Sequence, residues 1–156
     1  MKVDLQKAFD SVHWEFLIEW LKELKFPPLF IRWVMNCITS VHFTIYINGK
    51  QGTKFKGKRG LKQGDPLSPL LFVITMEYLS RLFKGASTQP RFEFHPHCKK
   101  FGITHLMFAD DLVIICKASP LSVKILMAAF QHFTECSGLQ ANMSKSQIVF
   151  GGAVPQ

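Results

Sequence analysis

The sequence has 156 residues and a mass of 17.8 kDa, enough to bury the core of one domain but too few for two large ones. Apolar residues make up 47% of the chain and charged residues 19%, which excludes intrinsic disorder as a description of the whole. Nineteen basic against eleven acidic residues give a net charge of +8. This excess favours a polyanionic partner, either nucleic acid or an anionic membrane.

The first half of the chain predicts helices and a β-hairpin. In chain order we expect a strand over residues 2–5, helices over 12–24 and 28–39, and strands over 41–47 and 53–58. Asp10 or Ser11 would cap the first helix, because both residue types are common at helix starts. Asn48–Gly49 is a strong signal for the tight turn of a hairpin.

The second half predicts two long helices around a second hairpin. We expect a helix from Asp65–Pro66 to Gly85, a polar connection over 86–102 that allows one short strand near Phe92, strands over 103–109 and 112–116, a helix from Ser119–Pro120 to Gly138, and a strand over 147–150. The helix ending at Gly85 is apolar on two sides and should be buried. We predict one α+β domain over residues 1–150, with a mainly antiparallel sheet and helices packed on one face, and a tail over 151–156.

A membrane or secreted protein is not indicated. The longest uncharged stretch, residues 33–49, is interrupted by Asn, Thr, Ser and His and does not resemble a spanning helix. Lys2 and Asp4 stand where a signal peptide would be apolar. Four scattered cysteines fit reduced thiols better than disulfides. We expect an intracellular protein without a membrane partner, and we leave nucleus and cytoplasm open.

All five aspartates lie in three short segments, while the predicted helices carry glutamate. Asp110–Asp111 sits between two apolar strands, and an exposed turn explains it about as well as a metal site. The apolar residues Phe108 and Ala109 beside the pair favour a site. Asp4 by itself is more typical of a strand end or cap. Together the three carboxylates form an oxygen-rich set suited to a pair of magnesium ions.

A glycine- and proline-rich loop, residues 59–69, precedes the buried helix and suits contact with phosphate or a nucleotide. Basic residues surround its start, and we predict that they bind nucleic acid, although a solvated basic hairpin is the simpler interpretation. These residues are Lys54, Lys56, Lys58, Arg59 and Lys62. The cluster of His95, His97 and Cys98 lacks a second ligand pair at zinc spacing, so a surface loop is favoured there.

Three segments in order resemble the signature motifs of reverse transcriptases, most of all those of non-LTR, LINE-type retrotransposons. They are DLQKAFDSV from Asp4, RGLKQGDPLSPLLF from Arg59 and FADD from Phe108. The stretch from His95 to Asp111 is similar to plant members of this family. The resemblance covers about residues 1–150 and implies a palm-like fold.

The resemblance also implies roles. Asp4 and Asp110 match the metal-binding carboxylates, and Asp111 matches a less direct acidic position; the cofactor would be two Mg²⁺ ions, or Mn²⁺ in their place. Phe9 matches the aromatic residue that selects deoxynucleotides by excluding a 2′-hydroxyl. The other matched positions are the nucleotide-contacting Leu5, Gln63 and Gly64, and Lys145, which matches a proposed proton donor to the departing pyrophosphate. Asp10 follows Phe9 in the family pattern but is expected to cap a helix.

The implied reaction transfers a deoxynucleotide from a dNTP to a primer 3′-hydroxyl on an RNA or DNA template. The sequence contains no counterpart of the family's fingers, thumb or endonuclease regions, so we expect a palm fragment of a longer polyprotein that is weak or inactive alone. Three alternatives remain: a non-catalytic nucleic-acid-binding remnant, a metal-dependent nuclease, and a pseudogene product that does not fold.

Overall fold

The computed structural model describes residues 1–151 and contains helices and antiparallel strands. The elements are β1 (Lys2–Gln6), α1 (Ala8–Ser11), α2 (Trp14–Glu23), α3 (Pro28–Thr39), β2 (His42–Ile47), β3 (Lys50–Lys56), α4 (Ser68–Ser87), the 3-10 helix η1 (Lys99–Phe101), β4 (His105–Phe108), β5 (Asp111–Ile114), α5 (Pro120–Ser137) and β6 (Gln140–Ala141). The predicted α+β class is confirmed. The predicted tail, apart from Gly151, lies outside the described residues.

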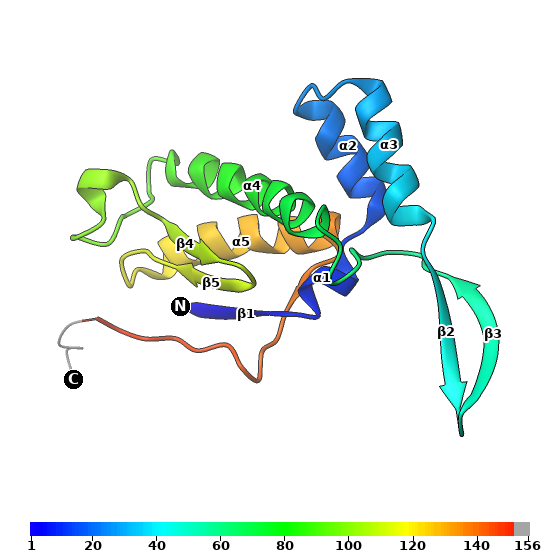
Figure 1. Cartoon of the computed structure of the whole chain (residues 1–156). Coiled ribbons are helices and arrows are strands. Elements are labelled where there is room, and N and C mark those ends of the chain that lie inside the picture. Colours follow the sequence, from blue (N-terminus) through cyan, green and yellow to red (C-terminus); the bar gives the residue numbers. More distant parts are fainter. Residues whose placement is uncertain (152–156) are drawn as a thin grey trace.

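A four-stranded sheet in the order β4-β5-β1-β6 forms the centre, and every pairing in it is antiparallel. Helices α4 and α5 lie side by side over one face of this sheet (Figure 1). Val3, Leu5 and Leu112 point to these helices and are buried, whereas Lys2 and Asp4 alternate with them and face away. One face of β1 therefore belongs to the core, and the other carries the polar residues of the first motif.

Helix α4 is the core element that the sequence predicted, but only one of its two apolar sides is fully buried. Thr75, Leu79 and Phe83 are fully enclosed, while Leu70 and Val73 are more than 60% exposed. The helix also runs past Gly85 to Ser87. A single glycine lowers helix propensity, but it does not end a helix whose other residues are held by packing.

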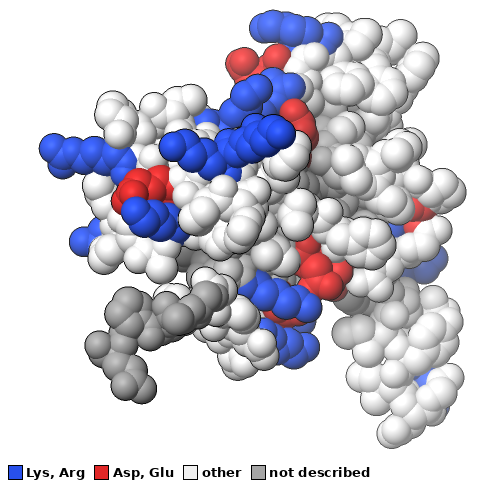
Figure 2. Space-filling model, turned by 90° about the vertical axis from the view of Figure 1, so that its left-hand side faces the viewer, with Lys and Arg blue, Asp and Glu red and all other residues white. Residues whose placement is uncertain are grey.

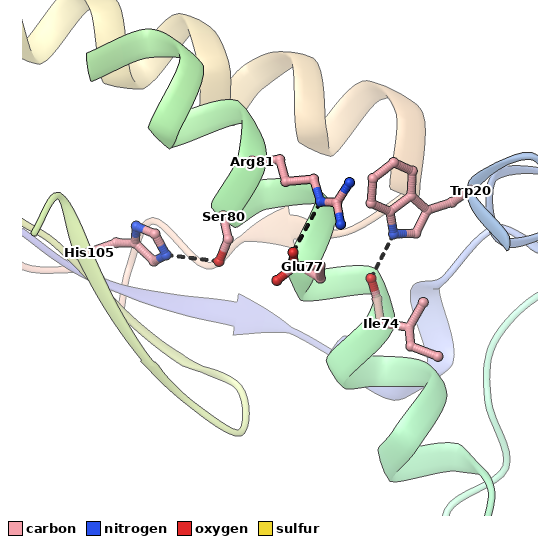
Figure 3. A network of polar contacts seen from close by, with 6 residues as sticks. All are labelled: Trp20, Ile74, Glu77, Ser80, Arg81 and His105. Carbon is pink, nitrogen blue, oxygen red and sulfur yellow. Dashed lines mark hydrogen bonds and ion pairs between the residues drawn. The ribbon is translucent and has the colours of Figure 1, made fainter. Parts of the chain in front are cut away.

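Polar contacts fasten α4 to its neighbours (Figure 3). The Trp20 indole N–H donates to the Ile74 carbonyl over 2.8 Å, and the Arg81 guanidinium lies 5.2 Å from the Trp20 ring centroid. His105 of β4 is 2.9 Å from the Ser80 hydroxyl. Burial lowers the pKa of His105, and the nearby Glu77 carboxylate acts in the opposite direction with a smaller effect.

Three local predictions are wrong. Asp10 and Ser11 do not cap the helix over 12–24; they form the one-turn α1, and α2 starts after His13 without a side-chain cap. No strand forms near Phe92. Residues 147–150 make only an isolated bridge, from Gln147 to Lys2, and the short strand β6 at 140–141 pairs with β1 in their place. Packing against an existing strand decides such short segments, since their own propensity is weak.

The β2–β3 hairpin projects from the rest of the molecule (Figure 1). Asn48 and Gly49 both have positive φ angles, as the predicted tight turn requires. Phe43 stacks on Phe55 across the hairpin, yet both rings remain about half exposed. Within residues 1–151, no helix combines the length and the hydrophobicity needed to cross a bilayer.

Candidate active site

Asp4 and Asp111 face each other across the sheet. The backbone register of β1 and β5 pairs Asp4 directly with Asp111. Directly paired residues in antiparallel strands point to the same side with their Cβ atoms about 5 Å apart. Two of the three predicted carboxylates, 107 positions apart in the sequence (111 minus 4), are thus brought together on the face that α4 and α5 leave open.

The third carboxylate, Asp110, belongs to the hairpin tip between β4 and β5. Phe108 pairs with Asp111, so Ala109 and Asp110 form a two-residue turn, and Ala109 has a φ angle of 52°. Positive φ at a non-glycine residue is uncommon and strained. Among residues 1–151, no group of three or more His, Cys, Asp or Glu side chains is arranged to hold a metal ion. The tertiary structure therefore presents a facing pair with a third acid beside it in the turn.

Lys2 is a site residue that the sequence analysis missed. Its ammonium Nζ lies 3.0 Å from Oδ1 of Asp111. Lys2 precedes Asp4 by two positions, so strand alternation places both on the same face, and this spacing is the signal that would have identified it. On the side of the molecule that Figure 2 shows, acidic and basic side chains lie against one another at several places.

The segment containing Lys145 lies against the backbone of Asp4. The Asn142 N–H donates to the Asp4 carbonyl over 2.7 Å, and the Asp4 N–H donates to the Ser146 hydroxyl over 3.3 Å. Lys145 sits in the turn between these two contacts and is exposed. The structure thus brings the last predicted motif next to the first one, and within residues 1–151 the Lys145 side chain makes no ion pair.

Phe9 lies where the first and second motifs meet. Its ring stacks on Phe72 of α4, with centroids 4.8 Å apart and planes 20° apart, and one side of it remains accessible. Leu5, predicted to contact nucleotide, is 4% exposed and packs in the core on the opposite side of β1 from Asp4. That burial removes its side chain from any surface nucleotide site, so the prediction for this side chain is not supported.

Backbone hydrogen bonds join the second motif to the first. The Leu61 N–H donates to the Phe9 carbonyl over 2.7 Å, and the Gly60 N–H donates to the Val12 carbonyl over 2.8 Å. The Trp14 indole donates to the Gly60 carbonyl over 2.8 Å. Gly60 has a φ of +91°, and a Cβ there would lie 2.7 Å from the Asp10 carbonyl oxygen. Only glycine fits this approach, which carries the loop past α1.

Beyond Gly60 the loop borders a cleft of about 600 Å³. Its lining includes Lys62 and Gln63 from the loop, and the aromatic residues Trp14, Phe43 and Phe55. Gly64 is exposed with a φ of +84°, and the Asp65 carboxylate then accepts the Leu67 N–H at the start of α4. Helix α4 begins only at Ser68, with Leu67 as its N-cap and no side-chain cap, so the prediction that Asp65 caps this helix is wrong; the Asp65 carboxylate closes the turn before it. The aromatic lining was not foreseen because its members come from three separate elements.

The predicted nucleic-acid-binding residues are exposed and make no ion pair within residues 1–151. Lys54 and Lys56 lie on β3, opposite Thr44 and His42. The remaining three lie in the loop between β3 and α4, on either side of Gly60: Lys58, Arg59 and Lys62. Since Phe43 pairs with Phe55, the two lysines and the aromatic pair occupy opposite faces of the hairpin. His95 and His97, ring centroids 5.6 Å apart, join no metal-binding group in the described chain.

The donor chemistry of the facing pair fits a divalent cation. Asp4 and Asp111 provide hard oxygen ligands at neighbouring positions of one open sheet face, and Asp110 is the next residue along. Oxygen donors of this kind suit Mg²⁺ and Mn²⁺ rather than zinc. The sheet therefore offers ligands of the right type at the position where the first and third motifs meet.

Comparison with known proteins identifies the family of the chain. Residues 1–153 match the family described as "Reverse transcriptase (RNA-dependent DNA polymerase)". A Pol polyprotein of the type-1 retrotransposable element R2 from Popillia japonica is 34% identical over the whole chain, which spans 26% of that protein. The R2DM polyprotein of Drosophila melanogaster is 30% identical over 92% of the chain, which spans 13% of it.

A short relative and a solved structure complete the comparison. The uncharacterized mitochondrial protein AtMg01250 of Arabidopsis thaliana is 36% identical over 70% of the chain, and the matched part makes up 89% of that protein. The structure of apo telomerase from Candida tropicalis, truncated from its C-terminal domain, superposes with a TM-score of 0.67 at 16% identity. It covers 99% of this chain and shows the shared fold. On these matches and its three ordered motifs, the chain belongs to the reverse transcriptase family and is similar to part of the R2 retrotransposon polyproteins.

Proposed function

We propose that the chain is the palm part of a retrotransposon polymerase that transfers a deoxynucleotide from a dNTP to the 3′-hydroxyl of a primer paired with an RNA or DNA template. The observation that carries this proposal is the direct pairing of Asp4 with Asp111, which joins the first and third family motifs on one open face. The hydrogen bonds from Gly60 and Leu61 to the first motif bring the second motif next to the segment that follows β1.

Asp4, Asp110 and Asp111 are the residues that would hold the divalent cations, Mg²⁺ or alternatively Mn²⁺. A bound pair of such ions lowers the pKa of an attacking hydroxyl and neutralises a leaving pyrophosphate. The protein itself contributes position. Strands β1 and β5 fix the spacing of Asp4 and Asp111, and the turn formed with Ala109 fixes the backbone position of Asp110.

Other residues would orient the nucleotide. Phe9, clamped against Phe72, has the rigidity needed to reject a ribose 2′-hydroxyl by steric clash. Gln63 and Gly64 lie in the exposed loop that reaches the cleft, within reach of an incoming nucleotide or a template base. Lys145, in the turn that bonds to Asp4, would donate a proton to the departing pyrophosphate.

We also propose that the chain acts within a longer polyprotein, because it spans only 13–26% of the R2 polyproteins that it matches. Its partners there would be other regions of the polyprotein, which grip the triphosphate and hold the duplex. For this reason we expect the isolated chain to extend a primer slowly. Fast extension by the isolated chain would contradict this expectation.

Single-nucleotide incorporation tests the proposal. The purified chain, at high concentration with a DNA primer on an RNA template, is expected to add one deoxynucleotide slowly in Mg²⁺ or Mn²⁺. Asp4→Asn and Asp110→Asn should abolish this addition, while Glu93→Gln, which changes a carboxylate in a distant ion pair with Lys117, should not. Equal incorporation by all four proteins would refute the assignment of the carboxylates, and cleavage without incorporation would favour a nuclease.

A second candidate, a non-catalytic nucleic-acid-binding remnant, is favoured by the exposed basic residues alone. The cationic side chains of β3 and the following loop have no acidic partner within residues 1–151, so they are available to phosphates. Under this candidate, salt-sensitive binding of RNA or DNA would persist while Mn²⁺ binding at Asp4 would be absent. The metal titration described below separates the two.

A further inference from the structure

We propose that Lys2 is a positioning residue that neutralises Asp111 and thereby lowers the affinity of the Asp4–Asp111 site for divalent cations. This inference rests on the proposed function, because it assumes that the facing carboxylates bind metal. It assigns to Lys2 a role in setting how strongly the site holds a cation before nucleotide and primer are present.

The first support is the geometry of the ion pair. Lys2 Nζ lies 3.0 Å from Asp111 Oδ1, and both side chains are about half exposed. The register pairs Lys2 with Val113 and Asp4 with Asp111, so the lysine on β1 reaches diagonally to the carboxylate on the neighbouring strand β5. The Asp111 carboxylate is therefore in direct contact with the Lys2 ammonium.

The second support is the inequality between the two facing acids. Asp111 has a cationic partner, whereas Asp4 makes no ion pair within residues 1–151. The other three ion pairs in that range all use glutamate on the helical side of the molecule or in the connection after α4. Lys2–Asp111 is thus the one ion pair of the described chain that involves a predicted metal ligand.

The physical consequence follows from charge. Two carboxylates directly opposite each other repel, and a cation relieves this repulsion, whether it is a lysine ammonium or a metal ion. A divalent ion that binds the pair must approach the Lys2 ammonium or displace it from Asp111. Exposed ion pairs contribute about 0.2–1 kcal/mol, so removal of the lysine charge should tighten binding by roughly 1.4- to 5-fold.

Titration of the metal-free chain with Mn²⁺, following the free ion by electron paramagnetic resonance, tests this inference without relying on activity. Lys2→Met should lower the dissociation constant about 1.4- to 5-fold, and Lys2→Arg, which keeps the charge, should retain the wild-type value. The matched control is Lys117→Met, which removes the same charge from an exposed ion pair with Glu93. A change in Lys2→Met no larger than in Lys117→Met overturns the inference.

Asp4→Asn separates the two possible failures. If Asp4→Asn weakens Mn²⁺ binding but Lys2→Met behaves like the control, the metal site stands and the role of Lys2 is refuted. If Asp4→Asn binds Mn²⁺ as the wild type does, the ion does not bind at Asp4, and the proposed metal site and the role of Lys2 fail together. Thermal unfolding of each variant verifies that it is folded, as expected for substitutions at exposed or half-exposed positions.

Discussion

Gly60 connects the second motif to the first, and replacing it with alanine should break that connection at a measurable cost. Two penalties combine. The φ angle of +91° is unfavourable for an L-residue by about 1–2 kcal/mol. The new Cβ would also lie within 3 Å of three backbone atoms of Asp10, which cannot rotate away as a side chain could, and overpacking of this kind costs about 1–3 kcal/mol. We expect Gly60→Ala to lower the free energy of unfolding by about 2–5 kcal/mol in total.

Gly64 provides the matched control in the same loop. Its φ angle of +84° is nearly the same, but nothing lies within 4 Å of the position that a Cβ would take. Gly64→Ala should therefore show only the backbone penalty, about 1–2 kcal/mol. Urea unfolding followed by circular dichroism measures both variants against the wild type, and comparable m-values ensure that midpoints can be compared. Equal destabilisation by the two substitutions would refute the close packing of Gly60 on Asp10.

Three further predictions concern pH, nucleotide choice and nucleic-acid binding. The pKa of His105 is lower in the folded than in the unfolded chain, so the unfolded chain takes up the proton first as the pH falls. The free energy of unfolding should therefore decrease as the pH falls below 6.5, the ordinary pKa of histidine. His105→Gln should flatten this decrease when urea unfolding is measured from pH 8 to 5. Phe9→Val should lower the preference for deoxynucleotides over ribonucleotides in single-nucleotide incorporation by up to about a hundredfold, the usual limit when shape alone rejects a hydroxyl; an unchanged preference would remove Phe9 from that role. Replacing Lys54, Lys56 and Lys58 together with glutamine should weaken binding of single-stranded RNA and reduce the slope of log K against log salt concentration by about 2, and an unchanged slope would show that these residues do not contact phosphates.

Local patterns in the sequence predicted most elements, because each carries its own start and stop signals. The span of α3 follows from Pro28 and helical spacing, and Gly138, with a φ angle of +79°, ends α5 as expected. The hairpin turn at Asn48–Gly49 likewise needs only its own two residues. The errors occur where the signal is weak: the start of α2, the end of α4 beyond Gly85, and the short C-terminal strands. There tertiary packing decides, since a few residues have too little propensity to decide alone.

The candidate site shows the same division. The identity of its acidic residues was readable from the sequence, because three ordered motifs are specific even when each alone is weak. The pairing of Asp4 with Asp111, the ion pair of Lys2 and the burial of Leu5 were not readable, since each depends on the register between strands that are far apart in the chain.

The sequence by itself determined the class of fold, the order of its motifs and the chemical types of the residues that they contain. These properties depend on spacing and composition over a few neighbouring residues. Only the tertiary structure decided which carboxylates face each other, which lysine pairs with one of them and which glycine packs against the backbone of the first motif. Those relations arise when segments more than forty residues apart pack together, and no local pattern encodes the distance between them.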